Sequence, residues 1–194
     1  NVGRMRFGAG VGLPAQLVDT RALLAADFDG DGLTDLIAYG IGNNSYGDYL
    51  WHNVGGTLVP WGQLPFVYGH AHGYAAGDLD GDGDLDLVAA RSHAGGAPNR
   101  VFRNDGNGVF TDTAAIGLGI FGSTMAVALG DVDGDGDLDA VFADYPQCTL
   151  WLGDGTGGFV DATNLLPIDQ MADEDVALAD LDGDGRLDIV FAAA

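Results

Sequence analysis

A nine-residue pattern rich in aspartate and glycine, D-x-D-G-D-G-x-x-D, occurs four times in this chain of 194 residues. The copies are DFDGDGLTD, DLDGDGDLD, DVDGDGDLD and DLDGDGRLD, which begin at Asp27, Asp78, Asp131 and Asp180. Their first aspartates are therefore 51, 53 and 49 residues apart. A period of roughly fifty residues is typical of stacked or circular architectures, in which each repeat buries its apolar faces against its neighbours.

The pattern supplies oxygen atoms at a spacing that suits calcium. This ion binds roughly six to eight oxygens at ~2.3 to 2.6 Å and tolerates irregular geometry. Carboxylates at positions 1, 3, 5 and 9, with a backbone carbonyl at position 7, can surround it. Glycine at positions 4 and 6 lets the chain turn inward, because a residue without Cβ accepts positive φ without a steric penalty.

Position 7 holds Leu, Asp, Asp and Arg in the four copies, which fits a residue that offers only its carbonyl. The predicted ligands, with position 7 acting through the backbone, are Asp27, Asp29, Asp31, Leu33 and Asp35; Asp78, Asp80, Asp82, Asp84 and Asp86; Asp131, Asp133, Asp135, Asp137 and Asp139; and Asp180, Asp182, Asp184, Arg186 and Asp188. Asp-Gly runs also form plain solvated turns, but four matching copies argue against that. Magnesium prefers a strict octahedron and usually keeps its waters. About four calcium ions are therefore expected.

The flanking sequences predict hairpins rather than EF-hands. An EF-hand loop has about twelve positions, ends on glutamate and lies between helices. Each loop here closes after nine residues and is followed at once by a short apolar run, LIAY, LVAA, AVFA or IVFA. Another run precedes each loop: LLAA, YAAG, VALG or VALA. Runs of this length indicate buried strands, so each loop should join two strands.

Two further strands are predicted in each period. Trp51, Phe102 and Trp151 end apolar pairs, and Val59, Phe110 and Phe159 follow eight residues later, with turn sequences rich in Gly, Asn and Asp between them. About four short strands per period is the content of one propeller blade. The strand before each loop is rich in small residues, as expected for an innermost strand near a ring axis. The sequence thus predicts an all-β fold of about four repeats of ~50 residues.

These features resemble the FG-GAP or VCBS repeats of integrin-α-type β-propellers. The resemblance rests on the four Asp-rich loops, on the L-x-V-like strands after them and on an N-x-G-x-G-x-F turn, seen most fully at Asn104–Phe110. It covers nearly the whole chain. It implies calcium ligation by the side chains at positions 1, 3, 5 and 9 and by the position 7 carbonyl. Propellers of the family usually have about seven or eight blades, whereas this chain holds about four.

We expect a single repeat region over residues 1–194. Its repeats are predicted at 8–59, 60–110, 111–159, and 160–194 combined with 1–7. The segment Asn1–Phe7 matches the turn and strand at Asn53–Val59, so the chain starts and stops within a repeat. It is therefore a piece of a longer ring, or four permuted blades that close on themselves, or an open arc whose edge another molecule fills.

Composition narrows the partners and the location. The net charge is −22, and the seven basic residues are arginines scattered along the chain. We therefore do not expect the chain to bind nucleic acid. No apolar run approaches the ~20 residues of a membrane span. Calcium loops of this kind suit the calcium-rich exterior of the cell, so we expect an extracellular or cell-surface location. Cys148 is the sole cysteine and forms no internal disulfide. Asn43 begins a formal glycosylation sequon.

One group of residues beside the second loop has separate chemical character. It comprises Trp61, Tyr68, His70, His72 and Tyr74. His70 and His72 alternate as on a strand, so both should face one side, where they can bind a transition metal or a sugar. The alternative is that they are ordinary polar residues at a blade edge.

Three functions remain open at this stage. The first is an extracellular calcium-binding module with a structural, adhesive or assembly role, whose partners are proteins, glycans or further copies of itself. The second is a carbohydrate-binding lectin. The third is the propeller fragment of a polysaccharide-degrading enzyme. Catalysis within this chain is not expected, because no serine or cysteine has a recognisable nucleophile setting and the aspartates are explained as metal ligands.

Overall fold

The computed structural model describes residues 20–40, 48–65, 70–92, 98–116, 123–168 and 173–193. This part of the chain is built from antiparallel strands and one short 3-10 turn, η1 (Thr163–Leu165). Within it, no helix is long and apolar enough to cross a bilayer. The residues Asn43 and Tyr68, and the segment Asn1–Phe7, lie outside the described ranges.

Each Asp-rich loop joins two paired strands, as predicted, and the first three pairs are extended by two more strands. We call the resulting groups units 1 to 4. Unit 1 contains β1 (Thr20–Ala26), β2 (Asp35–Gly40), β3 (Tyr49–Val54) and β4 (Thr57–Gln63); unit 2 contains β5 (His70–Gly77), β6 (Asp86–Ser92), β7 (Asn99–Asn104) and β8 (Phe110–Ile116); unit 3 contains β9 (Ser123–Gly130), β10 (Asp139–Tyr145), β11 (Thr149–Gly153) and β12 (Phe159–Asp161); and unit 4 contains β13 (Asp173–Ala179) and β14 (Asp188–Ala193).

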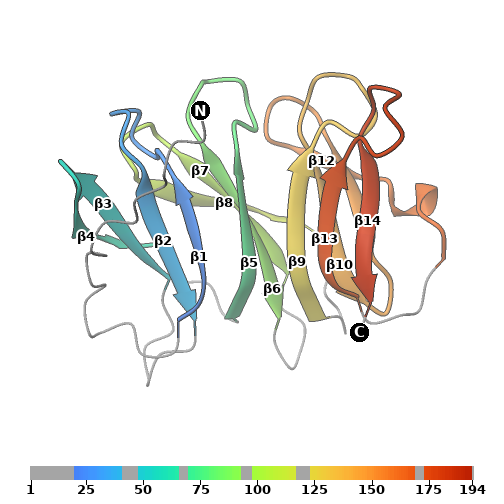
Figure 1. Ribbon diagram of the computed structural model, residues 1–194, viewed down its shortest axis with the longest axis horizontal. Helices are drawn as coiled ribbons and strands as arrows, with labels where there is room; N and C mark the ends of the chain where they lie inside the picture. Colours follow the sequence, from blue (N-terminus) through green and yellow to red (C-terminus); the bar gives the residue numbers. More distant parts are fainter. Residues whose placement is uncertain are drawn as a thin grey trace, which may run out of the picture.

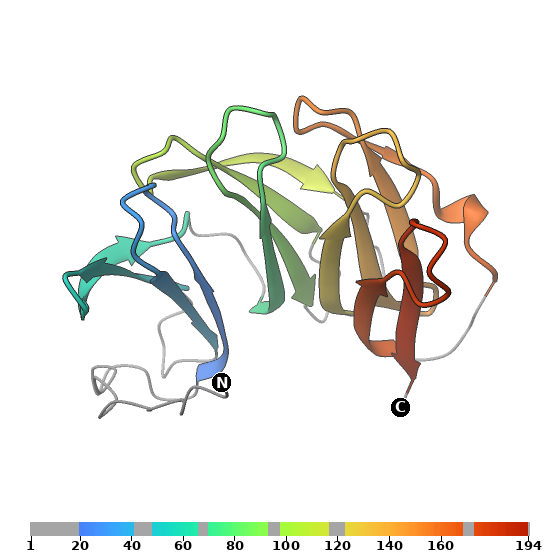
Figure 2. The same cartoon turned by 45° about the horizontal axis from the view of Figure 1, so that its top comes forward.

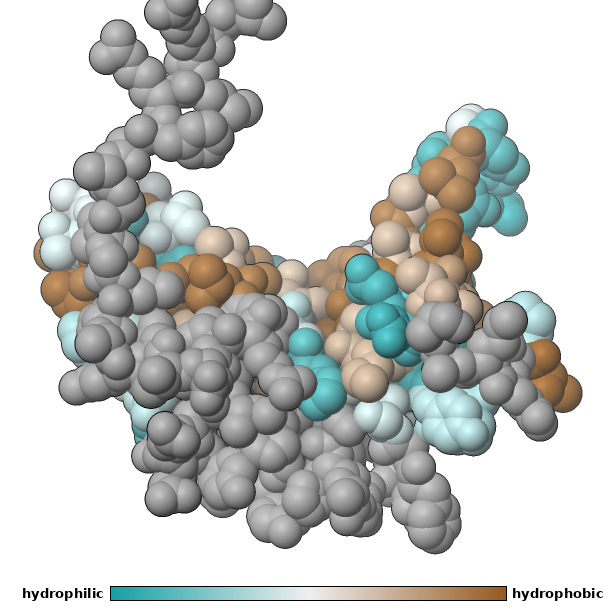
Figure 3. All heavy atoms as spheres, turned by 60° about the horizontal axis from the view of Figure 1, so that its bottom comes forward, coloured by the Kyte–Doolittle hydropathy of each residue, from teal (hydrophilic) through white to brown (hydrophobic). Residues whose placement is uncertain are grey.

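The units stand side by side in an arc (Figures 1 and 2). The first strands of the units, β1, β5, β9 and β13, lie next to one another along the inner side of the arc, where neighbouring ones are in contact. All four Asp-rich loops lie at the same edge, the upper one in Figure 1. Seen from the opposite edge, the surface is hollowed between the two ends of the arc, and apolar side chains are visible along the hollow (Figure 3).

The apolar core lies between the units, because β6 and β10, the second strands of units 2 and 3, are buried on both faces. In β10, Ala140 and Phe142 pack toward unit 2, whereas Val141 and Ala143 pack toward unit 4. All four side chains are fully buried. Since side chains alternate along a strand, an uninterrupted apolar run fills both interfaces at once. This explains why the sequence after each loop is continuously apolar rather than alternating.

Small residues on the inner strands leave room for the next unit. A Cβ added at Gly77 of β5 would lie 2.5 Å from Leu138 Cδ1 of unit 3. A Cβ at Gly130 of β9 would similarly lie 2.7 Å from Leu187 Cδ1 of unit 4. In both cases the glycine precedes the first aspartate of its loop, and the leucine occupies position 8 of the following loop. The small residues of the inner strands therefore set the close approach of successive units.

The outer turns also connect neighbouring units. The Trp61 indole of β4 lies against Gly108 in the β7–β8 turn, and the Arg103 guanidinium of β7 lies against Gly157 in the β11–β12 turn. Arg103 also donates a hydrogen bond through Nη2 to the carbonyl of Thr156. Each of these long side chains reaches from one unit to a glycine of the next.

The Trp61 contact predicts a specific glycine requirement. Gly108 has a φ of +70°, and a Cβ there would overlap the indole. We expect Gly108→Ala to lose about 1–2 kcal/mol from the left-handed conformation and a further ~1–3 kcal/mol from overpacking. Gly55→Ala is the matched control, because Gly55 has a φ of +60° with open space around it. Urea unfolding measures both losses.

A second substitution separates strain from overlap. In the Gly108→Ala background, Trp61→Ala should cost less than it does in the wild-type chain, because it removes the overlap. Equal losses for Gly108→Ala and Gly55→Ala would contradict the proposed role of this contact.

Candidate metal-binding loops

The four loops share one set of hydrogen bonds from backbone amides to side-chain carboxylates. The amide of position 6 donates to Oδ2 of position 1, the amide of position 5 to Oδ1 of position 3, and the amide of position 7 to Oδ1 of position 5. For the first of these the distances are 2.8 Å from Gly32 to Asp27, 3.0 Å from Gly83 to Asp78, 3.0 Å from Gly136 to Asp131 and 3.0 Å from Gly185 to Asp180. Aspartates that bond amides two residues on stabilise tight turns, so each loop wraps its carboxylates around a common centre.

The wrapping brings candidate donor atoms together in every loop. The carboxylates at positions 1, 3 and 9 gather in loops 1, 3 and 4, and those at positions 1, 3 and 5 gather in loop 2. Within each group, one oxygen of each residue lies within 4.8 Å of the others. Two oxygens on opposite sides of a calcium ion are roughly 4.6 to 5.2 Å apart, given its bond lengths. The residues therefore fit a calcium ion, and Asp27 Oδ1 in loop 1 is a buried oxygen without a hydrogen-bond partner.

The side chains at position 7 take no part in these groups. Leu33 and Arg186 are exposed, and the carboxylates of Asp84 and Asp137 lie against turn glycines of their own units. What position 7 contributes to the loop is its backbone, whose amide bonds position 5. This arrangement explains why the residue type at position 7 varies while the aspartates at positions 1, 3, 5 and 9 repeat.

The carboxylate at position 9 joins the loop to the third strand of the unit. Oδ2 of Asp139 accepts the amide of Val132 at 2.8 Å, and Oδ1 accepts the amide of Gly153, at the end of β11, at 2.9 Å. Asp35 and Asp86 repeat both bonds in units 1 and 2. These three carboxylates are almost completely buried.

Burial has an electrostatic consequence for these carboxylates. It raises the pKa of Asp86 and of Asp139, although the two backbone hydrogen bonds at each group act in the opposite direction and neighbouring loop aspartates raise the pKa further. A cation bound beside such a buried carboxylate would favour its ionised form.

The fourth loop keeps the pattern in a more open setting. Asp188 accepts the amide of Leu181 at 2.9 Å, which corresponds to the first of the two bonds in the other loops. The carboxylates of Asp180, Asp182 and Asp188 form a group that is more exposed than the equivalent groups of the other three loops. Leu181 is 67% exposed, whereas its counterparts Phe28 and Leu79 are buried between units. The fourth loop is therefore more exposed to solvent than the other three loops.

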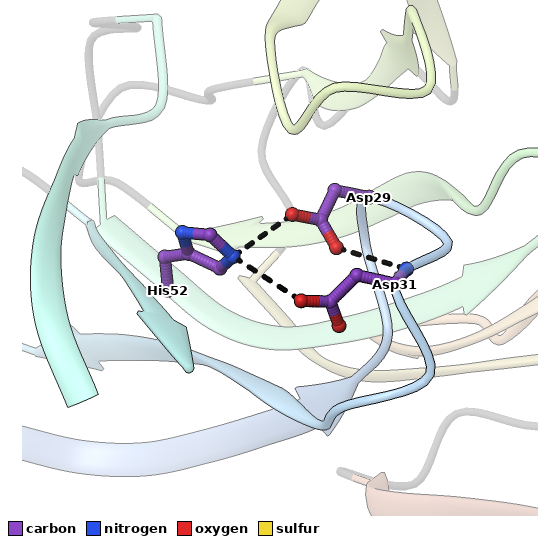
Figure 4. A group of neighbouring side chains, drawn as sticks. All are labelled: Asp29, Asp31 and His52. Atoms are coloured by element: carbon purple, nitrogen blue, oxygen red, sulfur yellow. Dashed lines mark hydrogen bonds and ion pairs between the residues drawn. The ribbon is translucent and has the colours of Figure 1, made fainter. Parts of the chain in front are cut away.

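A basic or imidazole side chain reaches two of the loops from the adjoining strand. His52 of β3 places Nε2 2.9 Å from Asp29 Oδ2 and 3.7 Å from Asp31 Oδ2 (Figure 4). Arg103, at the same register in β7, forms an ion pair with Asp80 and lies 3.6 Å from Asp86 Oδ2. Neither residue is among the site residues predicted from the sequence. The available signal was their position directly after Trp51 and Phe102, which places them in equivalent sites.

The aromatic and histidine group predicted beside loop 2 is only partly described. Trp61 of β4 stacks on His52 of the neighbouring strand β3. Tyr74 is buried and donates a hydrogen bond to Asp48, and His72 Nδ1 lies 3.1 Å from Met125 Sδ. The β5–β6 register shifts between Ala71 and Gly73, so strict strand alternation is interrupted at His72. The described members thus contact different neighbours, and the side chain of His70 is not described.

Two solved structures resemble this arrangement. One is a lectin of Agrocybe aegerita that recognises non-reducing terminal N-acetylglucosamine, with a TM-score of 0.56, 19% identity, and coverage of 90% of this chain and 47% of the lectin chain. The other is the V. cholerae biofilm matrix protein Bap1, with a TM-score of 0.54, 21% identity, and coverage of 89% of this chain and 28% of Bap1. The chain therefore spans less than half of either protein, and the likeness concerns the fold.

Sequence comparison identifies the repeat itself. No curated protein sequence matches the chain. A family model for the FG-GAP-like repeat matches three times, over residues 27–89, 78–142 and 131–191, and each match runs from one Asp-rich loop to the strand after the next. The matches together cover most of the sequence and confirm the resemblance drawn from the loops. The chain belongs to the FG-GAP-like repeat family.

Proposed function

We propose that this chain is an extracellular calcium-binding module of the β-propeller type, in which calcium stabilises the loops and the loops hold the units together. The observation that carries the proposal is the repeated loop geometry: four loops at one edge of the arc direct carboxylate oxygens toward a centre that fits calcium. The predicted ligands are the side chains at positions 1, 3, 5 and 9 and the carbonyl at position 7.

Charge favours a cation at these centres. Each loop holds four or five carboxylates within nine residues, and repulsion between them opposes folding unless a cation is present. In loops 2 and 3 the carboxylate at position 9 is in addition buried, which raises its pKa and disfavours its ionised form. A dication bound among these oxygens offsets both effects, so metal binding and folding are coupled.

Calcium bound in a loop would act on the whole unit. The position 9 carboxylate reaches the amide of the third strand, as Asp86 does with Asn104. Asn104 in turn donates through Nδ2 to the carbonyl of Phe28 in the loop of unit 1, at 2.7 Å. Ordering one carboxylate therefore orders a loop, a third strand and a contact with the preceding unit. This is a structural role rather than a catalytic one.

The loops predict a defined calcium stoichiometry. Calorimetric titration of calcium into the metal-free protein should give about four sites. Asp133→Ala should remove one of them, because it deletes a carboxylate at position 3. Asp137→Ala is the matched control in the same loop, since position 7 acts through its carbonyl, and it should leave the number of sites unchanged. The same stoichiometry in Asp133→Ala and the wild-type chain would refute the ligand assignment.

Chelation should lower the stability of the chain. A site at a free calcium concentration about 100 times its dissociation constant stabilises the native state by ~2.7 kcal/mol, so several sites together should raise the unfolding midpoint strongly. Thermal unfolding in calcium and in chelator measures the difference. Magnesium at the same concentration should give a smaller increase. An unfolding midpoint that is insensitive to calcium would contradict a structural role for the ion.

An adhesive or matrix role is supported by family and fold. FG-GAP-like repeats cover most of the chain, and the arc resembles part of a biofilm matrix protein. The calcium sites we propose would be filled at the calcium concentrations found outside cells. We infer that the chain works outside the cell and that the faces of its units present a surface to proteins or glycans.

Carbohydrate binding is a second candidate, and it is supported by the resemblance to the N-acetylglucosamine-recognising lectin. If the chain is a lectin, a glycan array probed in calcium should give a defined set of bound glycans, including ones with terminal N-acetylglucosamine. The signal should fall in chelator, because the loops that order the units would loosen. An array without bound glycans would remove this candidate and leave protein adhesion.

A further inference from the structure

The first loop differs from the others because an imidazole faces its carboxylates. We propose that loop 1 is a binding site for a transition-metal dication of the zinc class, with His52 Nε2, Asp29 Oδ2 and Asp31 Oδ2 as its protein ligands. These three side chains converge from the loop and from β3 (Figure 4). One nitrogen and two carboxylate oxygens form a donor set that suits zinc and neighbouring first-row metals, whereas calcium binds oxygen.

The distances fit zinc. In a tetrahedral site with bonds of ~2.0 to 2.2 Å, two ligand atoms are roughly 3.3 to 3.6 Å apart. The Nε2 atom of His52 lies 2.9 Å from Asp29 Oδ2 and 3.7 Å from Asp31 Oδ2. These two separations lie on either side of the tetrahedral value. Small side-chain rotations would therefore place a zinc ion in contact with all three atoms, and water would complete the coordination.

The donor atoms are oriented by other contacts. His52 stacks on Trp61 with a centroid distance of 4.6 Å and an interplanar angle of 27°. Its Nε2 atom is shielded from solvent and faces the carboxylates of Asp29 and Asp31, although the side chain as a whole is 26% exposed. Oδ1 of Asp29 and Oδ1 of Asp31 each accept a loop amide, which leaves the two Oδ2 atoms directed toward the imidazole. Groups that orient metal ligands in this way raise affinity.

In units 2 and 3 the position equivalent to His52 holds a residue that does not bind metal ions. Unit 2 has Arg103, whose guanidinium pairs with Asp80 and cannot bind a metal ion. Unit 3 has Leu152, which occupies the same register beside β10. A protonated His52 that serves only as a charge partner, as Arg103 does, is the competing explanation. The two explanations differ in whether zinc binding depends on His52.

The zinc site shares Asp29 and Asp31 with the calcium loop of the proposed function, so the two ions should compete at loop 1 only. Zinc binding itself does not require calcium in any loop. The inference can therefore fail while the calcium assignment stands, and calcium binding can fail while zinc still binds.

A reciprocal exchange of residues tests the proposal. The full chain is first freed of metal with a chelator, and the chelator is removed. Zinc is then titrated calorimetrically, and tryptophan fluorescence is followed because Trp61 contacts His52. His52→Leu should weaken the loop 1 zinc site by at least about tenfold and remove its fluorescence change. Leu152→His should add a zinc site at loop 3. Calcium should still compete with zinc at loop 1 in the wild-type chain.

The controls separate folding from metal binding. His52 is not one of the assigned calcium ligands, so His52→Leu should keep calcium binding at all four loops, which shows that the variant is folded. If His52→Leu fails to fold, the gain of a site in Leu152→His still tests the donor set. Equal zinc binding by the wild-type chain and His52→Leu, or no added site in Leu152→His, would overturn the proposal and assign His52 a charge-pairing role only.

Discussion

The buried carboxylate that ends each of the first three Asp-rich loops connects segments that are far apart in the sequence. In unit 3, Asp139 accepts one amide from its own loop and one from the end of β11. Hydrogen bonds to a charged acceptor contribute about 1.5–3 kcal/mol each, but burying the charge has a cost of similar or larger size. A cation in the loop changes that balance, since it stabilises the ionised form that both amides require. Loop, sheet and the proposed metal site would thus depend on the same carboxylate.

The arrangement of the core makes this connection matter beyond a single unit. The apolar clusters lie between units, so a sheet has no core of its own and is stable only against its neighbours. Position 2 of the first three loops contributes to these interfaces: Phe28 meets Phe110 of unit 2 edge to face, with ring centroids 5.7 Å apart. These loops therefore fix the position of an apolar side chain in the interface as well as a group of carboxylates at the edge. Such nearest-neighbour coupling is characteristic of repeat architectures.

Much of this structure could be predicted from the sequence, because its signals are local. The loops follow from a nine-residue pattern, and the buried strands follow from the uninterrupted apolar runs beside them. The long-range contacts could not be predicted in this way. The second amide on Asp86 comes from Asn104, which is 18 residues away, and nothing near Asp86 in the sequence indicates it. Likewise, the bulge at His72 interrupts an alternation that the sequence alone suggests.

Variation at one register position shows how repeats of equal fold acquire different chemistry. The residue after the aromatic of the third strand is His52, Arg103 or Leu152, and in units 1 and 2 it reaches the carboxylate at position 3. An arginine there compensates charge permanently and extends to the next unit through Thr156. An imidazole compensates charge only when protonated and otherwise offers a lone pair to a metal ion. The backbone of the repeat thus keeps the loop geometry constant, while a single side chain outside the repeated pattern changes which group faces the loop carboxylates.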